Sequence, residues 1–227
     1  MSIEIWLSGF LYLLILVLQI GMAAFGYILE PTPKHYESDY KLQNFINNPK
    51  KFKIGFGLAL IEHFCVVTLA IMLFFVISPY SILLGIVCII FRVTEGSIQV
   101  YIEKDYWGLL NLAGRYSAAS GEEKDSLMDS YRSILKTKSN RFAFAMIGWS
   151  IGTLAFSIVL VTYALAIPFI GWLGFVAGIL IGFANVMKLI KPNVKAYESL
   201  SSISGLLAIL FEILIGISLM FFPPVIP

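Results

Sequence analysis

The chain alternates between long apolar segments and shorter polar ones. Each apolar segment has about 20 residues or more, which is enough for a helix to cross a hydrocarbon core roughly 30 Å thick. The expected spans are residues 7–28, 54–78, 81–102, 142–166, 169–190 and 202–222. This pattern predicts an all-α membrane protein, in which residues 1–227 form a single membrane domain built as a six-transmembrane-helix bundle.

The connections between these spans are of two kinds. Pro79 and Pro168 mark very short turns after the second and fourth spans, whereas the other three connections are longer and polar. A short cytoplasmic amphipathic helix is expected at about residues 121–138, before the fourth span. Ser120 and Glu123 fit a capping box at its start.

The apolar side chains of this short helix are expected to share one face. They are Leu127, Tyr131, Ile134 and Leu135. Lys138 would close the helix at its negative end. The apolar face indicates a packed connector outside the membrane, and the alternative is a helix that docks on a membrane surface or a partner.

The basic residues are distributed unevenly along the chain. All of them except Arg92 fall in the three long connections. These residues are Lys34, Lys41, Lys50, Lys51 and Lys53 in the first connection, Lys104, Arg115, Lys124, Arg132, Lys136, Lys138 and Arg141 in the second, and Lys188, Lys191 and Lys195 in the third. With six spans, these connections share one side, while both termini and both short turns share the other. Basic residues in short loops mark the cytoplasmic side, so we predict a multi-pass protein of the cell membrane with cytoplasmic basic loops and external N- and C-termini.

The composition supports a membrane protein and argues against a soluble one. Hydrophobic residues make up 59% of the chain and charged residues only 13%, whereas soluble domains have about 25% charged residues. The net charge of +2 gives no basis for nucleic-acid binding. The expected partner is therefore the lipid bilayer.

Two rows of glycines at four-residue spacing predict close helix packing. Gly148 and Gly152 form one row in the fourth span, and Gly174, Gly178 and Gly182 form the other in the fifth. Rows of small residues let helix backbones approach closely in lipid. Because a short turn joins these spans, we expect the rows to pack the two helices as a hairpin, with a homodimer contact as the alternative.

Ionisable residues inside the spans are the candidates for function. Arg92 and Glu95 lie three residues apart near the middle of the third span, so a helix places them on one face, close enough to pair. Such residues are costly in hydrocarbon and usually face a protein interior. Further candidates for binding a ligand or ion are Glu62, His63, Gln99, Asn185 and Glu212.

The depths and directions of these residues limit how they can combine. Glu62, Arg92 and Glu212 are expected near mid-depth of their spans. His63 follows Glu62 but points about 100° away from it, so the two should not aim at one spot. If Arg92 pairs with one acid, two acids remain to be protonated or matched by another group.

These residues are compatible with a structural network, with a cavity for a solute or ion, or with an enzyme. Weak candidates for metal ligands are Glu62, His63, Glu95 and Glu212, because carboxylate and imidazole groups are good ligands. No metal-binding motif supports them, and no cofactor can be assigned. Every lysine falls in a loop or at the end of an expected helix, so no buried lysine is expected for a Schiff base.

The segment FRVTEGSIQVYIEKDYWGLLNLA (Phe91–Ala113) resembles the FR-x-x-E segment of a family of uncharacterised bacterial and archaeal multi-pass membrane proteins, a domain of unknown function. IPFIGWLGFVAGIL (Ile167–Leu180) is similar to that family's I-P-x-W-L-G-x-x-x-x-A-G turn and helix, here with Gly171 before the Trp-Leu-Gly sequence. LLAILFEILIGISLMF (Leu206–Phe221) resembles its last span, although Ser218 precedes a leucine where the family has tryptophan.

This resemblance implies a six-helix fold. It also implies that Arg92, Glu95 and Glu212 are polar positions of the family. It implies no activity.

We therefore expect a protein that binds or transports a small solute, ion or proton through a buried polar cavity. One alternative is a non-catalytic scaffold or accessory subunit of a membrane complex, and a second is an intramembrane metal-dependent enzyme. Besides lipid, the expected partners are a small-molecule or ion ligand, a second copy of the chain, or another membrane protein.

Overall fold

The computed structural model describes residues 2–27, 42, 47–191 and 194–222, and the side chains of Lys195 and Glu198 are outside this description. The expected loop residues Lys34 and Lys41 also lie outside the described residues. The helices are α1 (Ile3–Ala24), α4 (Pro49–Ile77), α5 (Ile82–Trp107), α6 (Leu109–Ala118), α7 (Glu122–Thr162), α8 (Pro168–Ile190) and α9 (Lys195–Phe221). Within the described part, six helices are long and apolar enough to cross a membrane, with α5 and α6 forming one of them. The all-α, six-span fold is thus confirmed.

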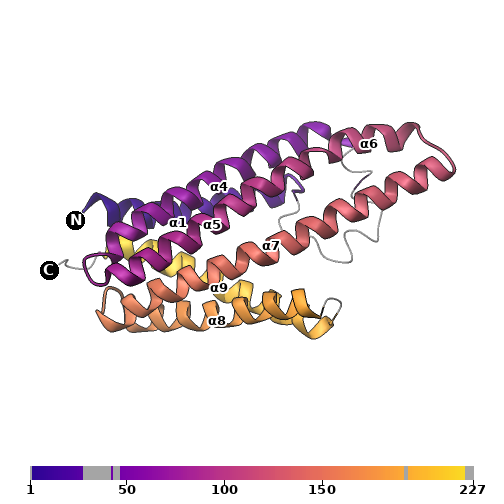
Figure 1. The fold of residues 1–227 in the computed structure, drawn as a ribbon. Helices are drawn as coiled ribbons and strands as arrows, with labels where there is room; N and C mark the ends of the chain where they lie inside the picture. The colour runs from indigo at the N-terminus through magenta and orange to yellow at the C-terminus, as the bar shows by residue number, and fades with distance from the viewer. Residues whose placement is uncertain (1, 28–41, 43–46, 192–193, 223–227) are drawn as a thin grey trace.

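The six long helices form a closed ring. Around the ring the order is α1, α4, α5, α7, α8 and α9, and α9 packs back against α1. Figure 1 shows these helices running along one common direction, with both chain ends at the same end of the bundle. A ring of this kind turns one side of every helix toward a shared interior, which is where polar groups escape lipid.

Local sequence signals explain several helix ends. Pro49 and Pro168 occupy the first turns of α4 and α8, where a missing N–H costs nothing. Ser81 caps α5 by accepting a hydrogen bond from the Leu84 amide at 3.3 Å. Gly26 has a φ of +74°, which ends the first helical segment before residue 28, earlier than expected.

The expected short amphipathic helix is not separate from the fourth span. Both are parts of α7, which runs without interruption for 41 residues. Gly121 stands at its N-cap and no side chain caps it, so the expected capping box with Ser120 does not form. The helix also continues past Lys138, because no proline or glycine occurs between residues 122 and 147 to end it.

The first part of α7 packs against α6 beyond the end of the other helices (Figure 1). Leu127, Tyr131 and Leu135 are buried there in a cluster that includes Leu109 and Leu112 of the α5–α6 arm. The predicted apolar face is therefore a packing face, as the connector interpretation requires.

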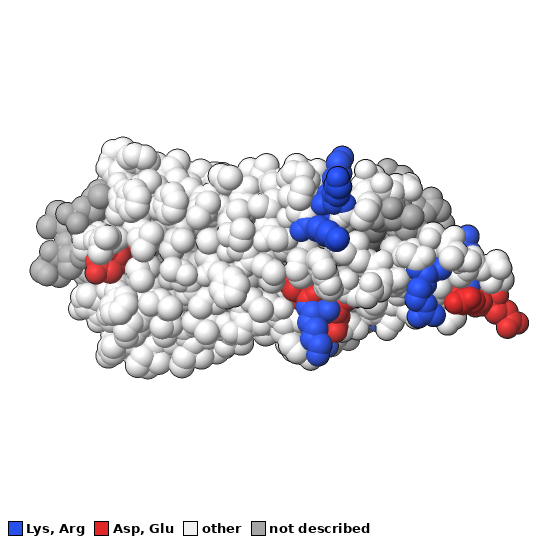
Figure 2. All heavy atoms as spheres, turned by 90° about the horizontal axis from the view of Figure 1, so that it is seen from above, with Lys and Arg blue, Asp and Glu red and all other residues white. Residues whose placement is uncertain are grey.

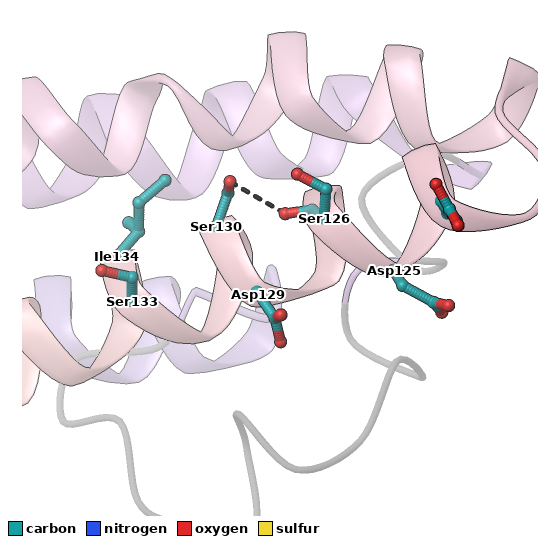
Figure 3. A pocket seen from close by; sticks show the side chains of 7 residues that line it. Asp125, Ser126, Asp129, Ser130, Ser133 and Ile134 are labelled. Atoms are coloured by element: carbon teal, nitrogen blue, oxygen red, sulfur yellow. Dashed lines mark hydrogen bonds between the residues drawn. The ribbon is translucent and has the colours of Figure 1, made fainter.

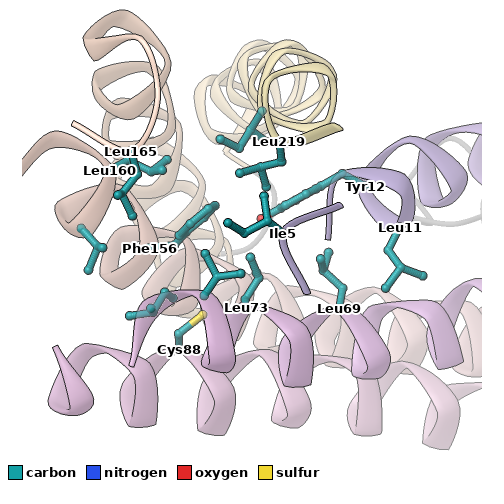
Figure 4. Packing of buried hydrophobic residues seen from close by; sticks show 14 of the residues in the cluster. Ile5, Leu11, Tyr12, Leu69, Leu73, Cys88, Phe156, Leu160, Leu165 and Leu219 are labelled. Carbon is teal, nitrogen blue, oxygen red and sulfur yellow. The ribbon is translucent and has the colours of Figure 1, made fainter. Parts of the chain in front are cut away.

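The main apolar core lies at the other end of the bundle, near the termini. Figure 4 shows Ile5 and Tyr12 of α1, Leu73 of α4 and Phe156 of α7 converging there. The rings of Tyr12 and Phe211 meet edge to face with centroids 6.3 Å apart. Aromatic contacts of this kind join α1 to α9 and help to close the ring.

The two short turns also meet at this end. The hydroxyl of Tyr163, after α7, donates to the carbonyl of Tyr80, before α5, at 3.2 Å. On the face drawn in Figure 2, the Lys and Arg side chains gather toward the opposite end, and a broad uncharged band separates them from the end with the termini. The charge pattern that underlies the predicted orientation is thus present on this face.

The two glycine rows do not pack as one hairpin contact. A Cβ on Gly178 of α8 would lie 2.9 Å from Leu154 Cγ of α7, so the row in α8 does face the fourth span. A Cβ on Gly148 would lie 2.9 Å from the Phe91 carbonyl of α5. The expectation that Gly148 and Gly152 contact α8 was therefore wrong, because α7 lies between α5 and α8 and turns this row toward α5.

Candidate functional site

A cavity of about 280 Å³ lies inside the helix ring, and each of the six long helices contributes to its wall. Its polar lining comprises Gln19 of α1, Glu62 of α4, Arg92, Glu95 and Gln99 of α5, Asn185 of α8, and Ser201 and Glu212 of α9. The structure therefore brings together all the predicted ligand-binding residues except His63. They come from four helices that are far apart in the sequence.

Arg92 and Glu95 form the pair that their spacing predicted. Arg92 Nη1 lies 2.8 Å from Glu95 Oε2, and both side chains are almost fully buried. The two atoms are within ion-pair distance although their angles do not meet hydrogen-bond criteria. This pair balances one of the three carboxylates in the cavity wall.

Glu212 of α9 is held by a neutral donor. The indole Nε1 of Trp149 in α7 donates to Glu212 Oε1 at 3.1 Å. Glu212 is only 8% exposed, so this bond connects the α7 and α9 parts of the cavity wall inside the protein. A hydrogen bond from an indole orients the carboxyl group but does not neutralise its charge.

Glu62 of α4 has one partner on each side. Gln19 Nε2 donates to Glu62 Oε1 at 3.0 Å, and Glu62 Oε2 lies 2.6 Å from Nδ1 of His63. The two neighbouring side chains touch here, although they do not line the same space. Only Glu62 reaches the cavity, since His63 lies behind it and lines a second, smaller space.

Several buried polar atoms in the cavity wall have no hydrogen-bond partner among the described residues. Besides the ion-paired Nη1 of Arg92 and Oε2 of Glu95, they are Nε of Arg92, Oε1 of Gln99 and Oδ1 of Asn185. The side-chain nitrogen of Asn185 donates to the Ile181 carbonyl at 2.9 Å. The side-chain oxygen of Asn185 is therefore the atom that is left without a partner among the described residues. Buried polar atoms are normally satisfied, so these three atoms leave hydrogen-bonding capacity unused in the wall.

A second buried cluster lies beside the cavity, toward the end with the basic residues. Tyr27 donates a hydrogen bond to Glu103, and Lys138 Nζ donates to the Tyr27 hydroxyl at 2.7 Å. Lys138 Nζ also lies 3.7 Å from Glu103 Oε1, and His63 Nε2 lies 3.4 Å from the same oxygen. Tyr27 lies beyond the end of α1, and burial, followed by the nearby Glu103 charge, raises the pKa of its hydroxyl well above the usual value.

This cluster corrects an expectation from the sequence. Lys138 was expected at a helix end in the polar connection, yet it is only 4% exposed. Glu103 comes directly after the expected third span, which ends at residue 102, and it is 2% exposed. Both are buried because α5 and α7 continue side by side past the apolar segments, so that their polar residues face each other.

The weak metal candidates do not form a metal site. Within the described ranges, no three His, Cys, Asp or Glu side chains are arranged so that they could hold a metal ion. Glu95 is instead paired with Arg92, and Glu212 with Trp149.

A larger and shallower hollow of about 750 Å³ lies on the projecting part of α7. Figure 3 shows Asp125, Ser126, Asp129, Ser130 and Ser133 along it, with the Ser130 hydroxyl bonded to the Ser126 carbonyl of the same helix. All its lining residues come from α7, and the hollow brings no residues of different helices together. We therefore place the candidate site in the inner cavity.

Residues 7–222 match the family described as "Domain of unknown function (DUF4386)", and the chain belongs to this family. The match covers nearly all of the membrane domain and includes every residue of the cavity wall. Comparison with curated proteins and with solved structures finds no match to this chain.

Proposed function

We propose that this DUF4386 protein binds a small, positively charged solute or ion in the cavity inside its helix ring and moves it across the membrane. The observation that carries this proposal is the charge of the cavity wall. Three carboxylates face one guanidinium there, and all four side chains are at most 8% exposed. The excess of acid favours a cation as the occupant.

The pairing within the wall supports a cation more specifically. Arg92 lies against Glu95, and Glu62 has His63 behind it, which leaves Glu212 as the carboxylate of the wall without a basic partner among the described residues. An uncompensated carboxylate is costly at this depth, so the group either takes up a proton or binds a cation. A cation that enters would therefore be stabilised by carboxylates from two different helices, α4 and α9.

The remaining wall favours an organic cation over a bare metal ion. Phe142, Met146 and Trp149 form an apolar side of the cavity, and aromatic faces attract ammonium groups. Gln99 and Asn185 present free carbonyl oxygens that can accept N–H hydrogen bonds. A cavity of about 280 Å³ also has room for several non-hydrogen atoms. These features together fit a small amine or quaternary ammonium compound.

Ligand-dependent stabilisation tests the binding step. Purified protein in lipid nanodiscs would be heated with sodium, potassium, methylammonium, choline or putrescine, and with neutral and anionic solutes of similar size. A ligand at 100 times its Kd adds about 2.7 kcal/mol to the free energy of unfolding. We expect an organic cation to raise the melting temperature, and the rise to be lost in Glu212→Gln.

Glu123→Gln is the matched control, because that glutamate is 62% exposed on the projecting part of α7. It should respond to the cation as the wild-type protein does. If no cation stabilises the protein, or if both variants respond alike, the cavity is not the binding site. A scaffold role would then account better for the buried pairs. Uptake of the stabilising cation into proteoliposomes tests the transport step separately.

A further inference from the structure

We propose that a chain of buried side chains carries protons between the basic end of the protein and the cavity. The chain of groups is Lys138, Tyr27, Glu103, His63 and Glu62. This proton path deepens the proposed function. It rests on that function at one point, because Glu62 belongs to the proposed cation site. It gives a role to the second cluster, which does not line the cavity.

Each group in this relay lies next to the following one. Lys138 Nζ is 2.7 Å from the Tyr27 hydroxyl, which in turn donates to Glu103. From Glu103 Oε1 the distance to His63 Nε2 is 3.4 Å, and from His63 Nδ1 to Glu62 Oε2 it is 2.6 Å. The two ring nitrogens of His63 therefore face two different carboxyl groups. This is the arrangement in which an imidazole can take a proton on one side and give one on the other.

The relay is separated from bulk solvent along its length. Glu62, His63, Glu103 and Lys138 are each at most 4% exposed, and Tyr27 is 7% exposed. A small space of about 10 Å³ lies among His63, Glu103 and Lys138, which is about the room that one water needs. Gln99 and Phe142 line both this space and the main cavity, so the two adjoin.

The proton steps balance without any further reactant. When Glu103 is protonated, its proton passes to Nε2 of a neutral imidazole that already carries a proton on Nδ1. The imidazolium then gives the Nδ1 proton to the carboxylate of Glu62. Glu103 regains a proton from the Lys138 ammonium through the Tyr27 hydroxyl, and Lys138 regains one from water at the basic end. The same steps in reverse remove the proton from Glu62 and return His63 to the tautomer that carries its proton on Nδ1.

Other titratable groups around the relay are few. Among the helices packed against α4, α5 contributes Arg92, Glu95 and Tyr106 in addition to Glu103, and α7 contributes Lys138. The first helix presents Gln19, which is uncharged, and α9 contributes Glu212, which shares the cavity wall with Glu62. Arg92 is engaged by Glu95, and Tyr106 packs its ring 3.7 Å from Lys138 Nζ. His63 is therefore the link between the two acids of the relay, and no other described basic side chain bridges them.

The relay would couple the occupancy of the cavity to protonation. A cation that approaches Glu62 favours its carboxylate form, so a proton leaves through His63. When the cation departs, a proton can return by the same path. Solute binding and proton movement would thus exclude each other at Glu62.

Infrared spectroscopy after a rapid pH change tests this path. The carbonyl stretch of protonated Glu62, identified by its loss in Glu62→Gln, would be followed in protein held in lipid bilayers. We expect His63→Gln to slow the response of this band by roughly 100-fold, which is the usual scale of a lost acid–base group. Glu103→Gln should slow it to a similar extent. His35→Gln removes the other histidine of the chain and serves as the control.

Two results would overturn the relay. One is an equally fast response in wild type and His63→Gln, which would mean that protons reach Glu62 from the cavity. The other is that no band of protonated Glu62 is found at any pH at which the wild-type protein stays folded. Circular dichroism and melting temperature show whether each variant is folded. If His63→Gln does not fold, Glu103→Gln is used in its place. If a cation binds but His63→Gln does not slow the Glu62 band, the relay is refuted and the proposed function is not. If His63→Gln slows the band but no cation binds, the proposed function is refuted and the relay is not.

Discussion

Gly152 of α7 lies directly against the stem of Arg92 in α5. A Cβ on Gly152 would stand 2.6 Å from Arg92 Cγ, closer than real Cβ atoms approach other atoms. Because Gly152 has no side chain, the Arg92 stem can lie between α5 and α7 where these two helices are in contact. In this way a packing residue determines where the guanidinium sits in the cavity.

Gly152→Ala should destabilise the protein and disturb the cavity. The added methyl group must displace the Arg92 stem, and overpacking of this kind costs about 1–3 kcal/mol in the free energy of unfolding. Thermal melting in nanodiscs measures the loss. Gly57→Ala is the control, because a Cβ on Gly57 meets nothing within 4 Å. Equal stability of the two variants would show that Arg92 does not occupy this position.

Trp149→Phe should weaken the contact between α7 and α9. The variant keeps an aromatic ring but removes the donor to Glu212, and a buried acceptor left without a partner costs about 1–3 kcal/mol. In a Glu212→Leu background the same change should cost much less, because the acceptor is gone. A double-mutant cycle of melting free energies measures this coupling. Additive effects would indicate that the indole and the carboxylate do not interact.

Cation binding should strengthen as the pH rises. A cation and a proton compete for a carboxylate of the cavity wall, because protonation removes the negative charge that attracts the cation. The affinity for the cation should therefore fall as the pH is lowered. If one proton leaves for each cation bound, affinity changes about tenfold for each pH unit within the titration range. Calorimetric titrations at several pH values measure this slope, which Glu62→Gln should reduce. An affinity independent of pH would contradict competition between proton and cation.

Single cysteines introduced at the two ends should be labelled from opposite sides of the membrane. After removal of Cys65 and Cys88, we expect Ser2→Cys to react with an impermeant reagent added outside intact cells. Ser130→Cys, on the exposed part of α7, should react only when the reagent reaches the cytoplasm. The expectation follows from the basic residues near α7. Reaction of Ser130→Cys from outside would reverse the predicted orientation.

The pattern of apolar segments predicted the fold because a helix that spans lipid must be long and uniformly apolar. The same physical constraint identified Arg92, Glu62 and Glu212, since an ionisable group inside such a segment has to find shelter. The structure places all three in one cavity wall. The similar depths of these residues along their spans suggested that they would lie together. Charged residues at one depth of a helix bundle tend to face the same part of its interior.

Residues near the ends of the spans were harder to assign. Lys138 and Glu103 occur in polar sequence, where exposure is the usual outcome, and only the joint extension of α5 and α7 buries them. Gln19 and Trp149 are an uncharged amide and an indole, so neither gave a signal of intramembrane charge. The helix that Gly148 and Gly152 contact depends on the order of the helices around the ring. The spacing of the glycines alone does not indicate which neighbouring helix they face.

The most direct test of the central claim is an experimental density map of the protein in lipid nanodiscs, with the most stabilising organic cation supplied. The proposed function predicts density for that cation inside the helix ring, between Glu62 and Glu212 and against the ring of Trp149. The account would be contradicted by a map in which the cation binds elsewhere, or in which the cavity side chains close on one another and leave no space between these two carboxyl groups.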